Sequence, residues 1–255
     1  MTVTTISYFR FGPISDRLWM FAQMGLARRA LARVSDIGFW KLFGTGIGQG
    51  FTPLPNTGLY AVLATWPDLD TAREQTRNTS VFKRFSQRAR ETFTVYLEPV
   101  SVRGRWSGHR PFTPIAEPDA LPRPLAVLTR ATIKPRRALQ FWRRAPAVSD
   151  TIGDNDDVVF KAGMGEVPGL QQVTFSIWPD MGTMSRFAYR SAAHAQAIRA
   201  VRDGNVFSEE LYARFAILAT EGSWEGGDPV SSHLIASAQS AEALSPPSPR
   251  TREGA

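Results

Sequence analysis

Cysteine is absent from the 255-residue sequence, and histidine is scarce, with three residues. The lack of cysteine excludes disulfides, thiolate zinc sites and a thiolate-ligated haem. It also fits a protein of the cytoplasm, where disulfides are rare. Any imidazole ligand must come from His109, His194 or His233.

A secretory signal and a membrane-spanning run are also missing. The N-terminal segment MTVTTISYFRF has no basic region followed by an apolar core. The most apolar helical stretch, at 18–27, lies between Arg17 and Arg28 and is about half the length that a bilayer requires. We therefore expect a cytoplasmic protein that is soluble or peripheral to the membrane.

The formal net charge is +7, but the arginines are scattered along the chain instead of forming one block. No zinc finger, ribonucleoprotein signature or helix-turn-helix accompanies them, so nucleic acid is not an expected partner. Two interpretations of the positive charge stay open. The basic residues cover solvated helix faces, or they form a surface that meets anionic lipid.

Trp-Pro-Asp occurs twice, at 66–68 and 178–180, each time at the end of an apolar run that predicts a buried strand. Helical segments follow in both places, and the two aspartates have the position of helix caps. Each half then gives another strand and a similar tag, RGRWSG at 103–108 or EGSWEG at 221–226. The sequence thus contains an internal repeat of about 110 residues, longer than a solenoid period.

Two glycine-rich segments, GTGIGQG at 44–50 and GMGEVPG at 163–169, precede the second strand run of each half. Neither fits G-x-G-x-x-G or ends in G-K-[S/T], so they predict turns or bulges, not nucleotide loops. The repeat matches them at one constant offset, with aligned pairs Phe43 and Phe160, Gly46 and Gly163, and Gly48 and Gly165.

Each half is predicted to run strand, helix, strand, strand, helix, strand, which is the order of a ferredoxin-like unit. One such α+β sheet leaves a face bare, and packing two sheets face to face covers both. We therefore expect tandem ferredoxin-like units that form a pseudo-dimeric α+β barrel with an apolar cavity. The expected divisions are units at 1–106 and 125–230, a proline-rich linker at 107–124 and a disordered tail at 231–255.

His194 is the histidine that falls on the apolar stripe of a predicted helix. The stripe repeats at helical spacing through Met184, Phe187, Ser191, His194, Ile198 and Val201. From spacing alone, His194 is either a core histidine with one hydrogen bond or an imidazole that faces a cavity. His109 lies in the linker and His233 at the start of the tail, so both should be solvated and a three-ligand metal site is not expected.

Five segments together resemble the spheroidene monooxygenase family of purple photosynthetic bacteria, from about residue 6 to 229. They are LWMFAQM, FWKLFGTGIGQGFTP, LTRATIK, DVVFKAGMGEVPGLQQVTFSIWPD and EELYARFAILATEGSWEG. The resemblance implies an O₂-dependent enzyme that places a keto group at C-2 of acyclic carotenoids, with electrons from reduced ferredoxin. It also implies haem, with His194 as the proximal and metal-binding ligand. It identifies no other catalytic residue.

This chemistry is compatible with the composition, because a C–H bond needs an oxidant that the acids and bases of the chain do not supply. Two successive hydroxylations at one carbon would give a geminal diol that loses water to a ketone. A lipid-soluble carotenoid also implies peripheral contact with the inner or photosynthetic membrane. The alternatives are a haem-free oxygenase or isomerase, or a carrier that holds an apolar ligand in the same barrel.

Overall fold

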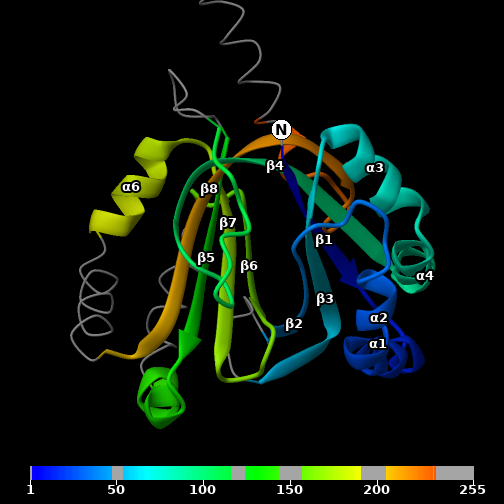
Figure 1. Ribbon diagram of the computed structural model, residues 1–255, viewed down its shortest axis with the longest axis horizontal. Coiled ribbons are helices and arrows are strands. Elements are labelled where there is room, and N and C mark those ends of the chain that lie inside the picture. Colours follow the sequence, from blue (N-terminus) through cyan, green and yellow to red (C-terminus); the bar gives the residue numbers. More distant parts are fainter. Residues whose placement is uncertain are drawn as a thin grey trace, which may run out of the picture.

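The computed structural model describes residues 2–47, 54–115, 124–143, 157–190, 205–231 and 233. The first half contains four strands and four helices (Figure 1): β1 (Val3–Arg10), α1 (Ile14–Leu26), α2 (Arg28–Leu31), β2 (Trp40–Gly46), β3 (Pro55–Trp66), α3 (Leu69–Asn78), α4 (Ser80–Arg88) and β4 (Glu91–Gly104). The second half repeats this order: β5 (Leu125–Ile133), η1 (Pro135–Arg137) leading into a helix at 138–143, β6 (Phe160–Gly165), β7 (Gln171–Trp178), α6 (Met181–Arg190) and β8 (Phe207–Gly222).

The eight strands close into a barrel in the order β1-β3-β2-β6-β7-β5-β8-β4. Each half on its own has the antiparallel order of a ferredoxin-like sheet, β4-β1-β3-β2 or β8-β5-β7-β6. The predicted α+β barrel of tandem ferredoxin-like units is therefore confirmed. One detail differs from the expectation, because the two sheets do not merely face each other. Hydrogen bonds between β2 and β6 and between β4 and β8 join their edges into one closed sheet.

The registers reveal a pseudo-twofold relation between the halves. Gly44 pairs with Gly165 at the seam between β2 and β6. Phe43 pairs with Ala61 in the first half, and Met164 pairs with Val173 in the second. Ala61 and Val173 are 112 residues apart, which is also the separation of the two Trp-Pro-Asp motifs. The predicted match of Phe43 with Phe160 is therefore wrong by four residues, because local glycine spacing does not report the register. Met164 is the counterpart of Phe43.

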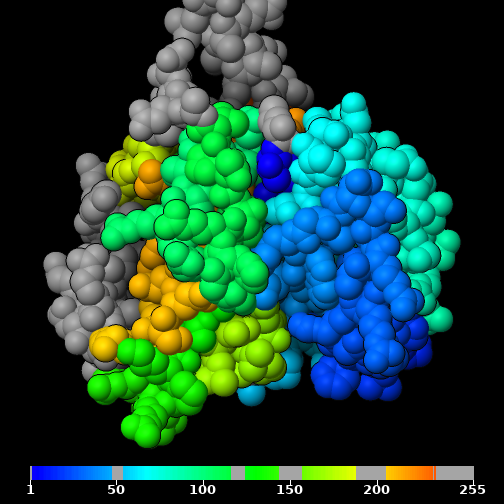
Figure 2. Space-filling view, viewed as in Figure 1, coloured from blue at the N-terminus to red at the C-terminus, as the bar shows by residue number. Residues whose placement is uncertain are grey.

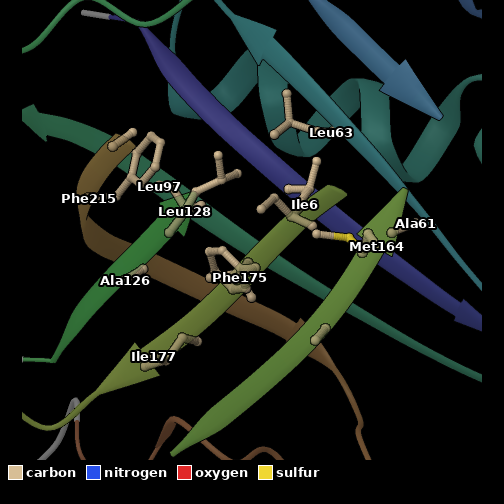
Figure 3. Close-up of a cluster of buried hydrophobic side chains, with 14 of the residues drawn as sticks. Ile6, Ala61, Leu63, Leu97, Ala126, Leu128, Met164, Phe175, Ile177 and Phe215 are labelled. Atoms are coloured by element: carbon tan, nitrogen blue, oxygen red, sulfur yellow. The ribbon is translucent and has the colours of Figure 1, made fainter. Parts of the chain in front are cut away.

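Apolar side chains from all eight strands fill the barrel instead of leaving the expected apolar cavity. Figure 3 shows Leu63, Met164 and Phe175 directed toward a common centre. These residues and their neighbours are almost completely buried, and inward positions alternate along each strand with period two. The interior is thus a packed core that holds the two halves together.

Both Trp-Pro-Asp motifs act as predicted, by ending a strand and capping the next helix. The Asp68 carboxylate accepts a hydrogen bond of 2.7 Å from the Thr71 N–H, and Asp180 accepts one of 2.8 Å from the Thr183 N–H. These are N-cap bonds for α3 and α6. Trp66, the first residue of its motif, donates from Nε1 to the Thr5 hydroxyl in the buried layer below the helices. Among the described residues, no helix is both long and apolar enough to cross a membrane.

Candidate functional site: two unequal barrel ends and an outer face

Each end of the barrel has an equivalent pair of aromatic side chains in contact. The ring centroids of Phe39 and Trp106 are 5.4 Å apart at one end, and those of Phe160 and Trp224 are 5.2 Å apart at the other. The tryptophans belong to the two repeated tags, which fold into the same tight turn after β4 and β8. We refer to these as the Trp106 end and the Trp224 end.

A network of charged groups seals the Trp106 end. The Glu166 carboxylate lies 2.6 Å from the Lys41 ammonium and accepts a 2.6 Å hydrogen bond from the Trp106 indole N–H. The Arg130 side chain is 1% exposed and its Nε lies 4.0 Å from Glu166, while its terminal nitrogen pairs with Glu209. Two cations and two carboxylates thus neutralise one another in a place with little water, where an unpaired charge would be costly.

Glu209 also fixes the turn that carries Trp106. Its carboxylate accepts hydrogen bonds of 2.7 Å from the backbone N–H groups of Ser107 and Gly108. Burial raises the pKa of Glu209, but these N–H donors and the Arg130 guanidinium outweigh burial and hold the pKa below its ordinary value. Glu209 is therefore a structural carboxylate, ionised at neutral pH, and not a proton donor.

The Trp224 end has small or neutral residues at the equivalent positions. The pseudo-twofold relation places Ala162 where Lys41 stands and Tyr8 where Arg130 stands, and Thr45 follows Gly44 as Glu166 follows Gly165 in the sequence. Ala162 and Thr45 carry no charge, so these two residues cannot form an ion pair across the seam between β2 and β6. Instead, a pocket of about 610 Å³ opens, and both Ala162 and Thr45 line it.

This pocket combines an apolar floor with a basic rim. Phe160, Trp224 and Leu59 contribute apolar surface, whereas Arg17 and Arg90 are among the cations of the rim. More of the pocket's surface is polar than apolar, so the pocket suits a ligand that has both polar and apolar parts.

Arg10 and Glu91 brace the wall of the pocket beside Trp224. The Arg10 guanidinium carbon lies 4.4 Å from the centroid of the Trp224 ring, and its Nε lies 3.3 Å from the Glu91 carboxylate. Burial raises the pKa of Glu91, but the N–H groups of Gly226 and Glu225 and the charge of Arg10 bring it below the ordinary value. This mirrors Glu209 at the opposite end.

Tyr8 lies behind the pocket floor, against Phe160 and Trp224, with ring centroids 5.2 and 5.6 Å away. Its side chain is fully buried, and its hydroxyl has no hydrogen-bond partner among the described residues. Burial raises the pKa of Tyr8 well above its ordinary value, so the phenol stays protonated. The Tyr8 hydroxyl can therefore donate a hydrogen bond near the pocket.

The outward-facing side chains of the two half-sheets differ in size. In the first half, Phe9, Leu42 and Val62 point outward into a buried cluster beneath the helices α1 to α4. Their counterparts in the second half are Ala131, Gly163 and Thr174, by the strand registers. The second half therefore has smaller side chains at these three outward positions.

The helix α6 lies on that side of the second half (Figure 1). The Phe187 ring packs on Trp178 at 5.2 Å, as its place on the predicted apolar stripe requires. His194 follows α6 in sequence and lies outside the described residues, as do Ser191, Ile198 and Val201. Its role as a ligand stays a prediction.

The other two histidines differ from each other. His109 is exposed, as expected for a solvated residue, although its backbone pairs with Trp106 in the turn. His233 is half-buried, and its N–H donates to the Val230 carbonyl. Within the described ranges, no three His, Asp or Glu side chains are placed to hold a metal ion. The acidic segment at 150–157 lies outside those ranges except for Asp157.

Sequence reasoning missed the charged network at the Trp106 end. Arg130 interrupts an otherwise uncharged strand, and it falls in the same alternation as the buried Ala126 and Leu128. A cation on the inward face of a strand predicts a buried partner, and this signal was available. Glu166 gave no such signal, because it lies in the turn beyond β6.

The fold and the pocket define a single-chain α+β barrel with one sealed and one open end. Solved structures with this fold include aldoxime dehydratase in complex with butyraldoxime, with a TM-score of 0.61 at 10% identity, covering 92% of this chain and 85% of that one. A second aldoxime dehydratase structure has a TM-score of 0.58 at 10% identity, covering 85% and 81%. At these identities the likeness concerns the fold alone. No protein-family model matches the sequence.

The chain belongs to the spheroidene monooxygenase family. It is 49% identical over 237 residues to spheroidene monooxygenase of Cereibacter sphaeroides, covering 92% of this chain and 73% of the relative. It is 46% identical to that of Rhodobacter capsulatus, covering 92% and 98%. The enzyme of Rubrivivax gelatinosus is 32% identical over 210 residues, covering 82% and 80%. The resemblance seen in the sequence is thereby confirmed.

Proposed function

We propose that this protein is a haem-dependent carotenoid monooxygenase. Its substrate would be spheroidene or a related acyclic carotenoid, converted at C-2 to a ketone such as spheroidenone with O₂ and electrons from reduced ferredoxin. The observation that carries the proposal is the 49% identity to a relative named spheroidene monooxygenase over 92% of the chain. We further propose a cytoplasmic location, peripheral to the inner or photosynthetic membrane.

The small side chains on the outer face of the second half fit a haem, since bulk is missing there and present in the first half. In a chain without cysteine, and with His109 exposed, His194 is the residue we propose as the proximal ligand. Arg214, a half-buried cation at an outward position of β8, would balance the haem carboxylates. Bound haem would supply the oxidising power that C–H cleavage needs.

The residues of the chain would do the positioning. The pocket at the Trp224 end would take the apolar end of the carotenoid, with Phe160 and Trp224 excluding water from it. Lys161 and Gly163, which point outward from β6, also line this pocket, so it adjoins the outer face that we assign to haem. Two hydroxylations at one carbon would give a geminal diol, whose loss of water leaves the ketone.

The deciding experiment is turnover of spheroidene by the purified protein with ferredoxin under ¹⁸O₂. The ketone should contain ¹⁸O, and the protein should show a Soret band. A haem-free oxygenase would give labelled ketone without the band. An isomerase or a carrier of apolar ligands would give no labelled product, and either result would overturn the proposal.

His194→Ala tests the ligand. It should abolish the Soret band and ketone formation while the chain stays folded, and added imidazole should partly restore haem binding because a hole of imidazole size remains. His109→Ala and His233→Ala are matched controls that should retain full haem. Retention of haem and activity in His194→Ala would assign the ligand elsewhere and leave His194 as a core residue.

The division of the chain is likewise a proposal. We propose units at 1–106 and 125–230, joined by the linker 107–124 and followed by a tail at 231–255. Limited proteolysis tests it, with first cuts expected in the linker and tail. Early cuts inside either unit would contradict it.

A further inference from the structure

Large apolar side chains are exposed along the whole outer face of α1. Ile14, Leu18, Phe21 and Leu26 are between 64% and 73% exposed. The opposite side of this helix is buried as well, through Met20 and its neighbours. A surface helix normally shows polar residues to water, and apolar residues on this scale indicate a surface that is covered by a partner.

Four more exposed apolar residues belong to elements at the same end of the molecule. Two flank the tip of the β2–β3 hairpin, one lies in the β6–β7 hairpin and one in the helix at 138–143: Ile47, Leu54, Val167 and Leu139. Figure 1 shows that α1, both hairpins and this helix lie at one end of the molecule, the lower end in that view, and Figure 2 shows the same end from the same side. Among the described large apolar residues that are exposed, Tyr212 on β8 is the exception. We call this end of the molecule the docking face.

The docking face is rimmed by cations. Arg28, Arg29 and Arg33 follow α1, and Arg136 and Arg137 precede the helix at 138–143. All five are exposed, and none forms a salt bridge with a described residue. The acidic residue of α1 differs, because Asp16 pairs with Arg88 at 3.1 Å and is thereby neutralised.

We propose that the docking face binds the surface of an anionic lipid bilayer. Apolar side chains between flanking arginines match the two layers that a bilayer offers, acyl chains below and anionic headgroups at the surface. The pocket at the Trp224 end is lined by Arg17 of α1 and by Asn56 and Gly58 of the β2–β3 hairpin. It therefore opens next to the docking face, where a lipid-soluble molecule can enter without crossing water.

This inference rests on the proposed function only for the nature of that molecule. Binding to lipid is measured without substrate, on vesicles of phosphatidylcholine with and without phosphatidylglycerol. The wild-type chain should sediment with the anionic vesicles and be released by salt.

Two double variants test the two layers. Arg28→Glu with Arg29→Glu should weaken partition by about 30-fold or more, since each basic residue contributes about fivefold at such a surface. Leu18→Glu with Phe21→Glu should weaken it by more than about tenfold. The matched control is Arg103→Glu with Arg105→Glu, which changes exposed arginines at the end of β4 and should bind as wild type.

Equal partition of all variants, or equal loss in the control, would overturn the proposal. The face could also be covered by a second copy of this chain. A wild-type dimer that Leu18→Glu with Phe21→Glu converts to a monomer, without vesicle binding in either, would assign the face to that copy instead.

Turnover of detergent-dissolved spheroidene separates the docking-face proposal from the monooxygenase proposal, because turnover should be unchanged in these variants. Loss of vesicle binding with normal turnover supports the docking face. Normal vesicle binding without any turnover by the wild-type protein would contradict only the proposal that the protein is a monooxygenase.

Discussion

Arg130 in β5 occupies the position that Tyr8 occupies in β1, and each side chain lies against the tryptophan that closes its end of the barrel. The Arg130 guanidinium carbon is 5.8 Å from the centroid of the Trp106 ring, and the Tyr8 ring is 5.6 Å from that of Trp224. Arg130 pairs with the carboxylates of Glu209 and Glu166, whereas the neutral Tyr8 needs no such partner.

Glu166→Gln tests how much the sealed end depends on charge. The substitution keeps the size of the side chain but leaves Lys41 and Arg130 without their shared carboxylate, so the free energy of unfolding should fall by about 3–5 kcal/mol. Urea titration measures it. Glu225→Gln is the control, because Glu225 is exposed and its pairing with Arg10 is worth about 1 kcal/mol or less. Equal small losses in both variants would show that the network is not isolated from water.

Ala162→Leu tests the open end. The added side chain would project into the pocket where Lys41 fills the equivalent space, so the KM for spheroidene should rise by about tenfold or more. The Soret band should not move, and the urea midpoint checks whether the added bulk is tolerated, because Ala162 is almost completely buried. Thr45→Ser retains the opening and the hydroxyl donor to the Leu59 carbonyl, and its KM should match wild type. An unchanged KM in Ala162→Leu would remove the pocket from the substrate path.

Gly104→Ala and Gly222→Ala should both be severely destabilising, by about 3 kcal/mol or more. Both glycines have positive φ, and a Cβ would lie 2.1 Å from a backbone oxygen of the neighbouring strand, that of Glu210 or Thr92. Thermal unfolding compares them with Gly108→Ala, where φ is also positive but a Cβ meets nothing within 4 Å. That control should lose about 1–2 kcal/mol, and a similar loss in all three would refute the steric argument.

Alkaline pH should unfold the protein partly through Tyr96. Burial raises the pKa of Tyr96 to about 12, even though its bond with Thr76 favours the ionised form. Because the pKa is higher in the folded state, the stabilisation is complete below about pH 10 and is lost as pH rises toward 12. The unfolding free energy of Tyr96→Phe, followed from pH 8 to 12, should therefore decline less steeply than that of wild type.

The sequence predicts the elements of this fold well because their signals are local. Apolar runs mark the strands that end in Trp-Pro-Asp, and Pro-Asp marks the start of both capped helices. The joining of the sheets has no local signal, because β2 and β6 meet over two residue pairs, Gly44 with Gly165 and Thr45 with Met164. Glycine spacing therefore misaligned the halves.

The candidate site was less accessible to sequence reasoning. The open end depends on Ala162 and Thr45, which are unremarkable residues until the register shows what stands opposite them. The small side chains on the outer face of the second half are likewise recognised only by comparison with the first half. Ala131, for example, is notable only because its counterpart is Phe9. His194 came from helical spacing and family resemblance, and its place stays a prediction.

The closure of the barrel through two seams within one chain has a consequence for how its ends can change. In a symmetric dimer of identical units, every substitution alters both ends together. Here the two copies are covalently joined and carry independent codons, so Lys41 and Glu166 could close one end while Ala162 and Thr45 left the other open. Because a substitution in one half leaves the other half unchanged, one end of the barrel can hold an entrance while the other end is sealed.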